Sequence, residues 1–169
     1  MEMRDMEKSL TLRSYWLRFW SLVTGLGMAV ASYLTIDHFF RANFPETIFT
    51  GSFCDISSFF NCDSSAYSSI AHFQGVPLGY WGLVLGILVM LGAVLPSPRF
   101  EKMNKFLSLP NALGVLTLFF YSVFHLKSLC LLCSGYYVFS LLNFYLFWKY
   151  GIESEPRGLF GFIKDLALG

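Results

Sequence analysis

Four cysteines are the residues of this chain best suited to chemistry, and they fall into two pairs. Cys54 and Cys62 lie in a polar stretch with seven residues between them, and Cys130-Leu-Leu-Cys133 opens an apolar run. Thiol–disulfide exchange passes two electrons from one cysteine pair to another through a mixed disulfide. Two pairs that meet in space would therefore form a two-step electron relay.

Two other interpretations of the cysteines stay open at this point. In an oxidising compartment both pairs could be static structural disulfides. A four-thiolate metal site is also conceivable, although the loop pair lacks the CxxC spacing of zinc sites. The histidines show no helical ligand spacing among themselves, so we expect no metal site from His38, His72 and His125. The chain also lacks the motifs of a catalytic triad, a phosphate loop or a dinucleotide site.

The composition indicates where these cysteines are held. Hydrophobic residues make up 55% of the 169 residues and charged residues only 14%, against about 25% charged in a soluble domain. So much apolar surface cannot all be buried inside a chain of this length, and we expect the lipid bilayer to cover it. The formal net charge of +1, without a basic stripe, argues against a nucleic-acid partner.

Charged residues leave four long apolar stretches, each close to the ~20 residues that a helix needs to cross a hydrocarbon core. We therefore predict an all-α integral membrane protein, built as a four-transmembrane-helix bundle. The expected spans within a membrane domain over residues 14–150 are 15–36, 77–96, 106–126 and 128–148.

The parts between and beyond the spans complete this picture. The outer loop 37–76 should carry a short interfacial helix after Cys62, because one apolar stripe follows it, namely Ala66, Tyr67, Ile70, Ala71 and Phe73. We expect residues 1–13 to form a cytoplasmic N-terminus. The tail 151–169 is too short to span and reads as a cytoplasmic amphipathic segment.

Basic residues set the expected orientation. Ten of the twelve Lys and Arg residues flank one side of the predicted spans, and only Arg41 and Lys127 lie on the other. The positive-inside rule then places both termini in the cytoplasm and all four cysteines on the outer side. Cleavage of the first span as a signal peptide, near Ala29-Val30-Ala31, is the competing interpretation.

Local signals suggest how the helices pack and start. Small residues recur at four-residue spacing, which lets helix backbones approach closely, in the pairs Gly25/Ala29, Gly27/Ala31 and Gly82/Gly86. Pro110 and Asn111 are expected to open the third span, at a kink or an interhelical hydrogen bond. Ser128 is the expected N-cap of the fourth helix, where the helix N-terminus and Lys127 would favour a thiolate on the nearby cysteines.

With these motifs in place, the chain resembles the vitamin K epoxide reductase family, in its bacterial disulfide-forming branch. The resemblance covers roughly residues 14 to 150. The resemblance rests on the spacing of Cys54 and Cys62, on the CxxC motif of Cys130 and Cys133, and on four further elements: Ser68, Gly75-Val-Pro77, Gly82 and Tyr137. The loop pair precedes the CxxC here, which is the reverse of the order in DsbB-type proteins.

The resemblance implies a four-helix bundle around a quinone, either ubiquinone or menaquinone. Cys133 would be the thiol nearest the quinone and Cys130 its disulfide partner, while Cys62 would exchange with Cys130. Cys54 would meet the incoming thioredoxin-fold protein. Ser68 and Tyr137 would line or order the quinone-proximal site. Because the chain stops at Gly169 without a fused thioredoxin-like domain, we expect a separate DsbA-like partner.

The function expected from this resemblance is that of a quinone-dependent thiol oxidoreductase in the bacterial inner membrane. It would reoxidise its exported partner and so drive disulfide formation. Several aromatic residues near the depth of Cys133 could contact a quinone ring, although each is individually more typical of packing: Tyr80, Trp81, Tyr121, Phe124, Tyr136 and Tyr137. The alternative is a thiol-based membrane redox sensor or assembly factor that switches without turnover.

Overall fold

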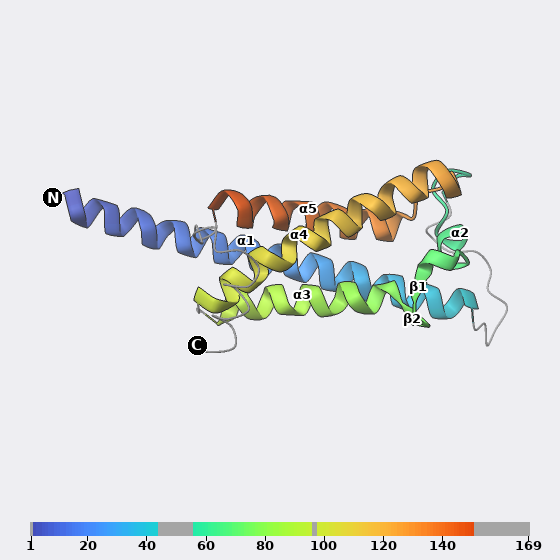
Figure 1. The fold of residues 1–169 in the computed structure, drawn as a ribbon, viewed down its shortest axis with the longest axis horizontal. Helices are drawn as coiled ribbons and strands as arrows, with labels where there is room; N and C mark the ends of the chain where they lie inside the picture. The colour runs from blue at the N-terminus through green and yellow to red at the C-terminus, as the bar shows by residue number, and fades with distance from the viewer. Residues whose placement is uncertain (1, 44–55, 96–97, 151–169) are drawn as a thin grey trace.

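A computed structural model describes residues 2–43, 56–95 and 98–150. Cys54 and the predicted tail 151–169 lie outside these ranges. Four long helices run along one axis, and the short elements that follow Cys62 cover one end of them (Figure 1). Helix α1 packs mainly on α3 and α5, and α4 packs mainly on α5.

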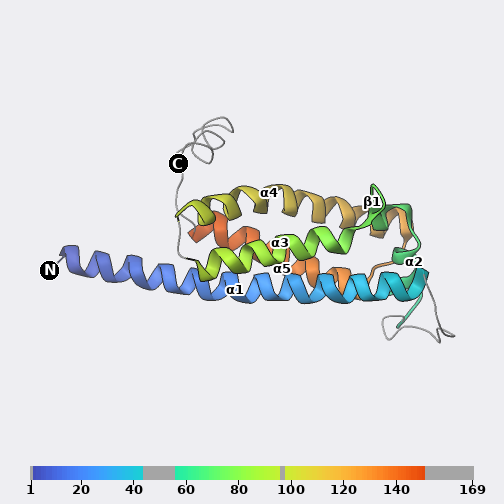
Figure 2. The ribbon, with the colours of Figure 1, turned by 90° about the horizontal axis from the view of Figure 1, so that it is seen from below.

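Helix α1 runs without interruption from Glu2 to Asn43, well beyond the predicted span 15–36. Its first turns project past the rest of the bundle (Figure 2). Residues 37–43, expected in the outer loop, are helical instead. Between Met28 and Asn43 the sequence has no Gly or Pro to end the helix, and an ion pair of 2.9 Å between Arg41 Nε and Asp37 Oδ2 supports its last turns.

The other long helices also differ from the predicted limits. Helix α3 covers Leu78–Val94 and α5 covers Leu131–Tyr150. Helix α4 covers Pro98–Tyr121 and continues into a π-helical turn, η2, at Ser122–Leu126. Pro110, expected near the opening of the third span, lies well inside α4. The helix begins at Pro98 instead, in the first turn, where a missing backbone N–H costs nothing.

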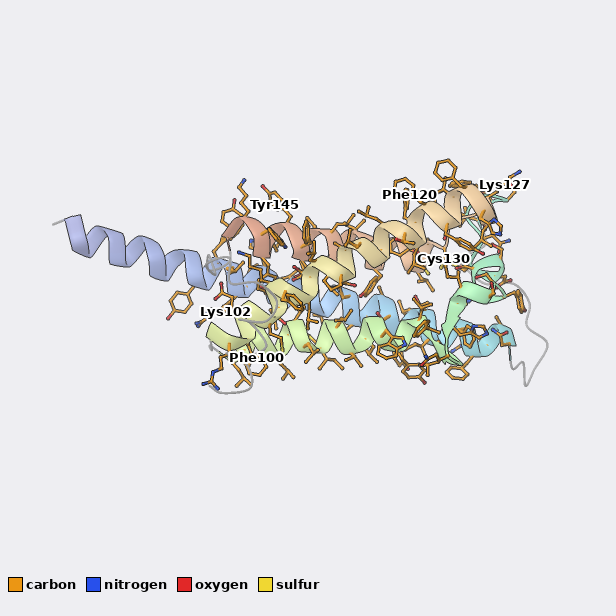
Figure 3. All side chains as sticks on the ribbon, viewed as in Figure 1. Phe100, Lys102, Phe120, Lys127, Cys130 and Tyr145 are labelled. Atoms are coloured by element: carbon orange, nitrogen blue, oxygen red, sulfur yellow. The ribbon has the colours of Figure 1, made fainter. Side chains whose placement is uncertain are left out.

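The bundle has the surface of a membrane protein. Side chains point outward along α3, α4 and α5 (Figure 3). Large apolar residues are exposed on every long helix, among them Leu26, Val84, Leu113, Phe120 and Val138. Segments 15–43, 99–126 and 131–150 are long and apolar enough to cross a membrane. Helix α3, with 17 residues, reaches only about 25 Å at ~1.5 Å per residue. The chain is thus an all-α membrane protein, while the count of four spans stays a prediction.

Small residues bring α1 and α3 into backbone contact, as their spacing predicted. A Cβ atom placed on Gly86 would lie 2.8 Å from the backbone N of Ala29 and 3.0 Å from the carbonyl O of Gly25. At Gly82 a Cβ would meet the Ser32 hydroxyl. Only glycine permits this approach.

Replacing Gly86 by alanine should therefore destabilise the bundle by about 1–3 kcal/mol, because the new methyl group meets backbone that cannot yield. Gly135→Ala is the matched control, since its Cβ would find only Ala31 Cβ at 4.0 Å; it should be neutral or slightly stabilising. Unfolding in mixed micelles measures both variants. Equal stability of the two would show that the α1–α3 approach does not depend on Gly86.

The elements that cover the cysteine end are short. Helix α2 covers Cys62–Ala66 and a 3-10 turn, η1, covers Ser69–Ala71. The strands β1 (His72–Phe73) and β2 (Val76–Pro77) then form a hairpin that leads into α3. A helix after Cys62 was expected, but a hairpin was not. It forms because Gln74 and Gly75 adopt positive φ angles of 52° and 82°, which a two-residue turn between twisted strands requires.

Candidate functional site

Backbone hydrogen bonds join the segment before Cys62 to the segment before Cys130. Leu129 N donates to Phe59 O at 2.6 Å, and Asn61 N donates to Leu129 O at 3.2 Å. Phe60 and Leu129 form a parallel β-bridge, so the two segments enter α2 and α5 side by side. Two cysteines 68 positions apart in the sequence are thereby brought to one point.

Side chains of α1 and α2 hold this arrangement in place. His38 Nε2 lies 3.1 Å from Asp63 Oδ1, and the Tyr67 hydroxyl donates to the carbonyl of Ala42 at 2.9 Å. On the other side, the hydroxyls of Ser64 and Ser128 contact each other. Cys62 is therefore fixed between the end of α1 and the start of α5.

The sulfur atoms of Cys62 and Cys130 are in direct contact. Cys130 Sγ donates a hydrogen bond to Cys62 Sγ over 3.1 Å, and the two residues are only 1% and 4% exposed. Cys62 is disulfide-bonded, whereas Cys130 and Cys133 are in the thiol form. A thiol against a sulfur of a disulfide is the arrangement from which thiol–disulfide exchange proceeds.

The N-terminus of α5 is capped by Cys130 and not by Ser128 as predicted. Helix α5 starts at Leu131, and Cys133 N donates to Cys130 Sγ at 3.4 Å. This is the bond that an N-cap side chain accepts from the third helical residue. Ser128 turns its hydroxyl to Ser64 instead. Lys127 ends η2 in a left-handed conformation and lies at the outer edge of the bundle (Figure 3).

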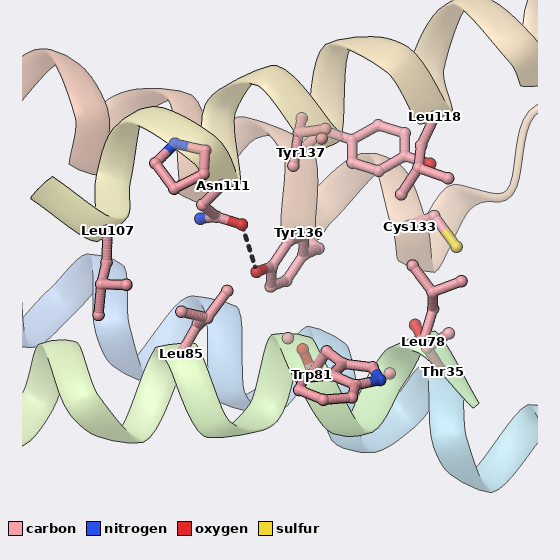
Figure 4. A pocket seen from close by; sticks show the side chains of 16 residues that line it. Thr35, Leu78, Trp81, Leu85, Leu107, Asn111, Leu118, Cys133, Tyr136 and Tyr137 are labelled. Atoms are coloured by element: carbon pink, nitrogen blue, oxygen red, sulfur yellow. Dashed lines mark hydrogen bonds between the residues drawn. The ribbon is translucent and has the colours of Figure 1, made fainter. Parts of the chain in front are cut away.

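A cavity of about 320 Å³ begins at Cys133 and extends between α3 and α4 (Figure 4). These two helices have few contacts with each other, which leaves the space open. Its lining is mostly apolar and comes from α1, α3, α4 and α5: Ser32, Thr35, Leu78, Gly79, Trp81, Gly82, Leu85, Leu107, Pro110, Asn111, Gly114, Val115, Leu118, Cys133, Tyr136 and Tyr137. The volume falls in the range of small-molecule sites, about 300–1,000 Å³.

A second, smaller cavity of about 70 Å³ lies at the junction of the two cysteine segments. Cys62, Cys130 and Cys133 all line it. Cys133 alone of the three also lines the larger cavity. It is therefore the residue that connects the sulfur contact to the apolar cavity.

One polar cluster interrupts the apolar lining of the larger cavity. The Tyr136 hydroxyl donates to Asn111 Oδ1 at 3.0 Å (Figure 4), and Asn111 Nδ2 donates to the Ser140 hydroxyl at 2.8 Å. Asn111 thus makes the interhelical hydrogen bond expected of it. The two bonds hold the amide in one orientation at the cavity wall.

The structure assembles some of the predicted site residues and leaves others apart. Trp81, Tyr136 and Tyr137 line the larger cavity. Ser68 lines neither cavity, and its hydroxyl donates to the carbonyl of Ser65 at 2.8 Å. Nor do Tyr80, Tyr121 and Phe124 contribute to them. Among the described residues, His, Cys, Asp and Glu form no cluster able to hold a metal ion.

Sequence reasoning missed the two residues of α1 that line the larger cavity. Ser32 and Thr35 reach the larger cavity, but a serine or threonine in a membrane helix commonly bonds to its own backbone, as Thr35 Oγ1 does to Ala31 O at 2.8 Å. Their position toward the cavity follows only from the rotation of α1 against α3 and α5.

Comparison with known proteins agrees with this geometry. The family model described as "Vitamin K epoxide reductase family" matches residues 19–148, which include both described cysteine segments and every residue that lines the larger cavity. A search of curated proteins returned no match. Members of this family are oxidoreductases, and the match indicates a membrane thiol oxidoreductase. The chain belongs to the vitamin K epoxide reductase family.

Proposed function

We propose that this protein is a quinone-dependent thiol oxidase that reoxidises a separate thioredoxin-fold protein. One observation carries the proposal: Cys130 Sγ lies 3.1 Å from Cys62 Sγ, and Cys133, three residues on, lines the apolar cavity. Electrons would pass from the loop pair to Cys130 and Cys133, and then to a quinone.

The exchange step follows from the sulfur contact. A reduced Cys62 attacks Cys130 of the Cys130–Cys133 disulfide, so that the Cys62–Cys130 bond forms and the Cys130–Cys133 bond breaks. Cys133 leaves with the electron pair as a thiolate. The backbone N–H that Cys133 donates to Cys130 Sγ holds the attacked sulfur in place during this step.

The larger cavity fits a quinone head group. It has room for a flat ring, and Trp81, Tyr136, Tyr137 and Asn111 in its wall would hold one. A bound quinone supplies a lipid-soluble acceptor for two electrons. The residues of the chain orient it, keep water away from Cys133 and bring the thiol to the cavity wall.

The partner and the sidedness belong to the same proposal. Cys54 would exchange with a DsbA-like protein on the outer side of a bacterial inner membrane, with both termini in the cytoplasm, as the distribution of basic residues predicts. A redox sensor without turnover would need the sulfur contact but would have no use for a 320 Å³ cavity beside Cys133. The cavity therefore favours the oxidase.

The proposal is tested with the purified protein in lipid nanodiscs, mixed anaerobically with a reduced thioredoxin-fold protein and either ubiquinone-1 or menadione. We expect one partner disulfide for each quinone reduced, followed by quinone absorbance and by thiol labelling of the partner. Thiol oxidation without loss of quinone would contradict the proposal. The quinone that turns over faster identifies the preferred class.

A further inference from the structure

A row of polar side chains, called the file below, lies along the contact between α4 and α5, inside the membrane-spanning part of the bundle. Helix α4 presents Asn104, Ser108 and Asn111, and α5 presents Tyr136, Ser140 and Asn143. Both sets have spacings of three and four residues, which place each set on one helix face. Polar groups at this depth are costly to bury and commonly mark a pathway or a functional site.

These side chains are almost completely buried. Asn104, Ser108, Ser140 and Asn143 are exposed by 3% or less. Hydrogen bonds connect part of the file, from Tyr136 to Asn111 at 3.0 Å and from Asn111 to Ser140 at 2.8 Å. Thr24 of α1 donates to Asn143 Oδ1 at 3.3 Å.

Asn104 is the exception in this file. Neither Nδ2 nor Oδ1 of its amide has a hydrogen-bond partner within the described residues, although the residue is only 2% exposed. It lines a cavity of about 10 Å³ together with Ser108, Asn111 and Asn143. A cavity of about this size holds one water molecule when two to four polar groups surround it. A water there would satisfy Asn104 and join it to the rest of the file.

The file has two distinct ends. One end is the Asn111–Tyr136 pair in the wall of the larger cavity (Figure 4). The other is Asn104, in the second turn of α4. Its neighbour Lys102 lies at the end of the bundle opposite Cys130 (Figure 3). The cavity of about 10 Å³ at Asn104 adjoins the larger cavity of about 320 Å³, since Leu85, Leu107 and Asn111 line both of them.

We propose that this file, with a water bound at Asn104, supplies the protons for quinone reduction from the end of the bundle opposite the cysteines. The inference rests on the proposed function. As the Cys130 and Cys133 thiols form their disulfide, they give up two electrons and two protons. Their protons leave at the cysteine end, and two protons from the file reach the ring oxygens of the quinone that takes up the electrons, which gives the quinol.

The chemistry of the file suits this role. Hydroxyl groups and water both accept and donate hydrogen bonds, so they can take up a proton at oxygen and release another. The Asn111 amide lies between the hydroxyls of Tyr136 and Ser140 and cannot pass a proton itself, so these two bonds position the Tyr136 hydroxyl. The water held at Asn104, in the cavity that adjoins the larger one, carries the proton toward the quinone. Asn111 and Tyr136 are the members of the file that line the larger cavity, and of the two only Tyr136 has a hydroxyl.

The test uses the whole protein in sealed vesicles of neutral lipid that contain menadione in the membrane and a pH-sensitive dye in the lumen. Reduced thioredoxin, added outside, reacts only with molecules whose cysteine end faces outward. We expect the lumen to become alkaline as quinone is reduced, by about two protons for each quinone. A protonophore should abolish the pH change and leave quinone reduction intact.

Asn104→Leu should slow lumen alkalinisation at least about fivefold and leave formation of the Cys62–Cys130 disulfide unchanged. Thr117→Val is the matched control on an exposed face of α4 and should behave like the parent protein. Quinone reduction without alkalinisation of the lumen, measured on the parent protein, would overturn this inference and leave the proposed function standing. Absence of quinone reduction altogether would overturn both.

Discussion

Replacing Cys133 by serine is expected to stop turnover at a disulfide between Cys62 and Cys130. The Cys130 thiol lies 3.1 Å from the sulfur of Cys62, which is itself disulfide-bonded. Attack of the Cys130 thiolate on Cys62 would form the Cys62–Cys130 disulfide and break the existing disulfide of Cys62, whose other sulfur leaves as a thiolate. Without Cys133, no thiol on α5 can resolve the new disulfide. Quinone reduction should fall at least about a thousandfold, as expected when one member of a set of groups that act together is removed.

Mass spectrometry of digested, alkylated protein detects this species as a linked peptide pair. Cys130→Ser is the matched variant: it should be equally inactive but should yield no such linkage. A Cys62–Cys133 linkage in Cys130→Ser, formed as fast as the Cys62–Cys130 linkage in Cys133→Ser, would show that the observed sulfur contact does not select the attacking thiol.

Gly114→Leu is expected to block the larger cavity while the sulfur chemistry continues. Gly114 lines that cavity, and a Cβ on it would meet no heavy atom within 4 Å. A leucine side chain on a helix leans toward the preceding turn, here toward Pro110 and Asn111 in the cavity wall. The new side chain can therefore enter the cavity without displacing a helix, and quinone reduction should fall about 10–100-fold through weaker binding.

Two measurements separate this effect from a folding defect. The Cys62–Cys130 disulfide should still form in Gly114→Leu/Cys133→Ser at the rate of Cys133→Ser alone. Thr117→Leu, one turn further along α4 and exposed, should keep the full rate of quinone reduction. If Gly114→Leu reduced quinone as fast as the parent protein, the quinone would have to bind elsewhere.

The class of the protein could be predicted from the sequence because it depends on local properties. Apolar stretches of about 20 residues predict membrane helices, and small residues at four-residue spacing correctly predicted the close approach of α1 to α3 at Gly86. The limits of the helices were less accurate. Pro110 does not start a helix, because the preceding residues from Pro98 onward continue it.

The pairing of cysteines in sequence suggested a relay, but only the tertiary structure decided which sulfurs meet. Cys62 reaches Cys130 because backbone hydrogen bonds join Leu129 to Phe59 and Asn61. The residue types in these two segments do not predict such a bridge. The same holds for the cap of α5. Ser128 has the better N-cap side chain, but its hydroxyl contacts Ser64. The sulfur of Cys130 therefore accepts the capping hydrogen bond from Cys133 N.

The cavity likewise belongs to the tertiary structure. Trp81 and Tyr137 could be proposed as lining residues, yet so could Tyr80, Tyr121 and Phe124, which line neither cavity described beside the cysteines. An aromatic side chain in a membrane helix has the same sequence signal whether it faces lipid or the bundle interior. What separates the two groups is the rotation of each helix and the gap between α3 and α4, and both arise from packing among all four long helices.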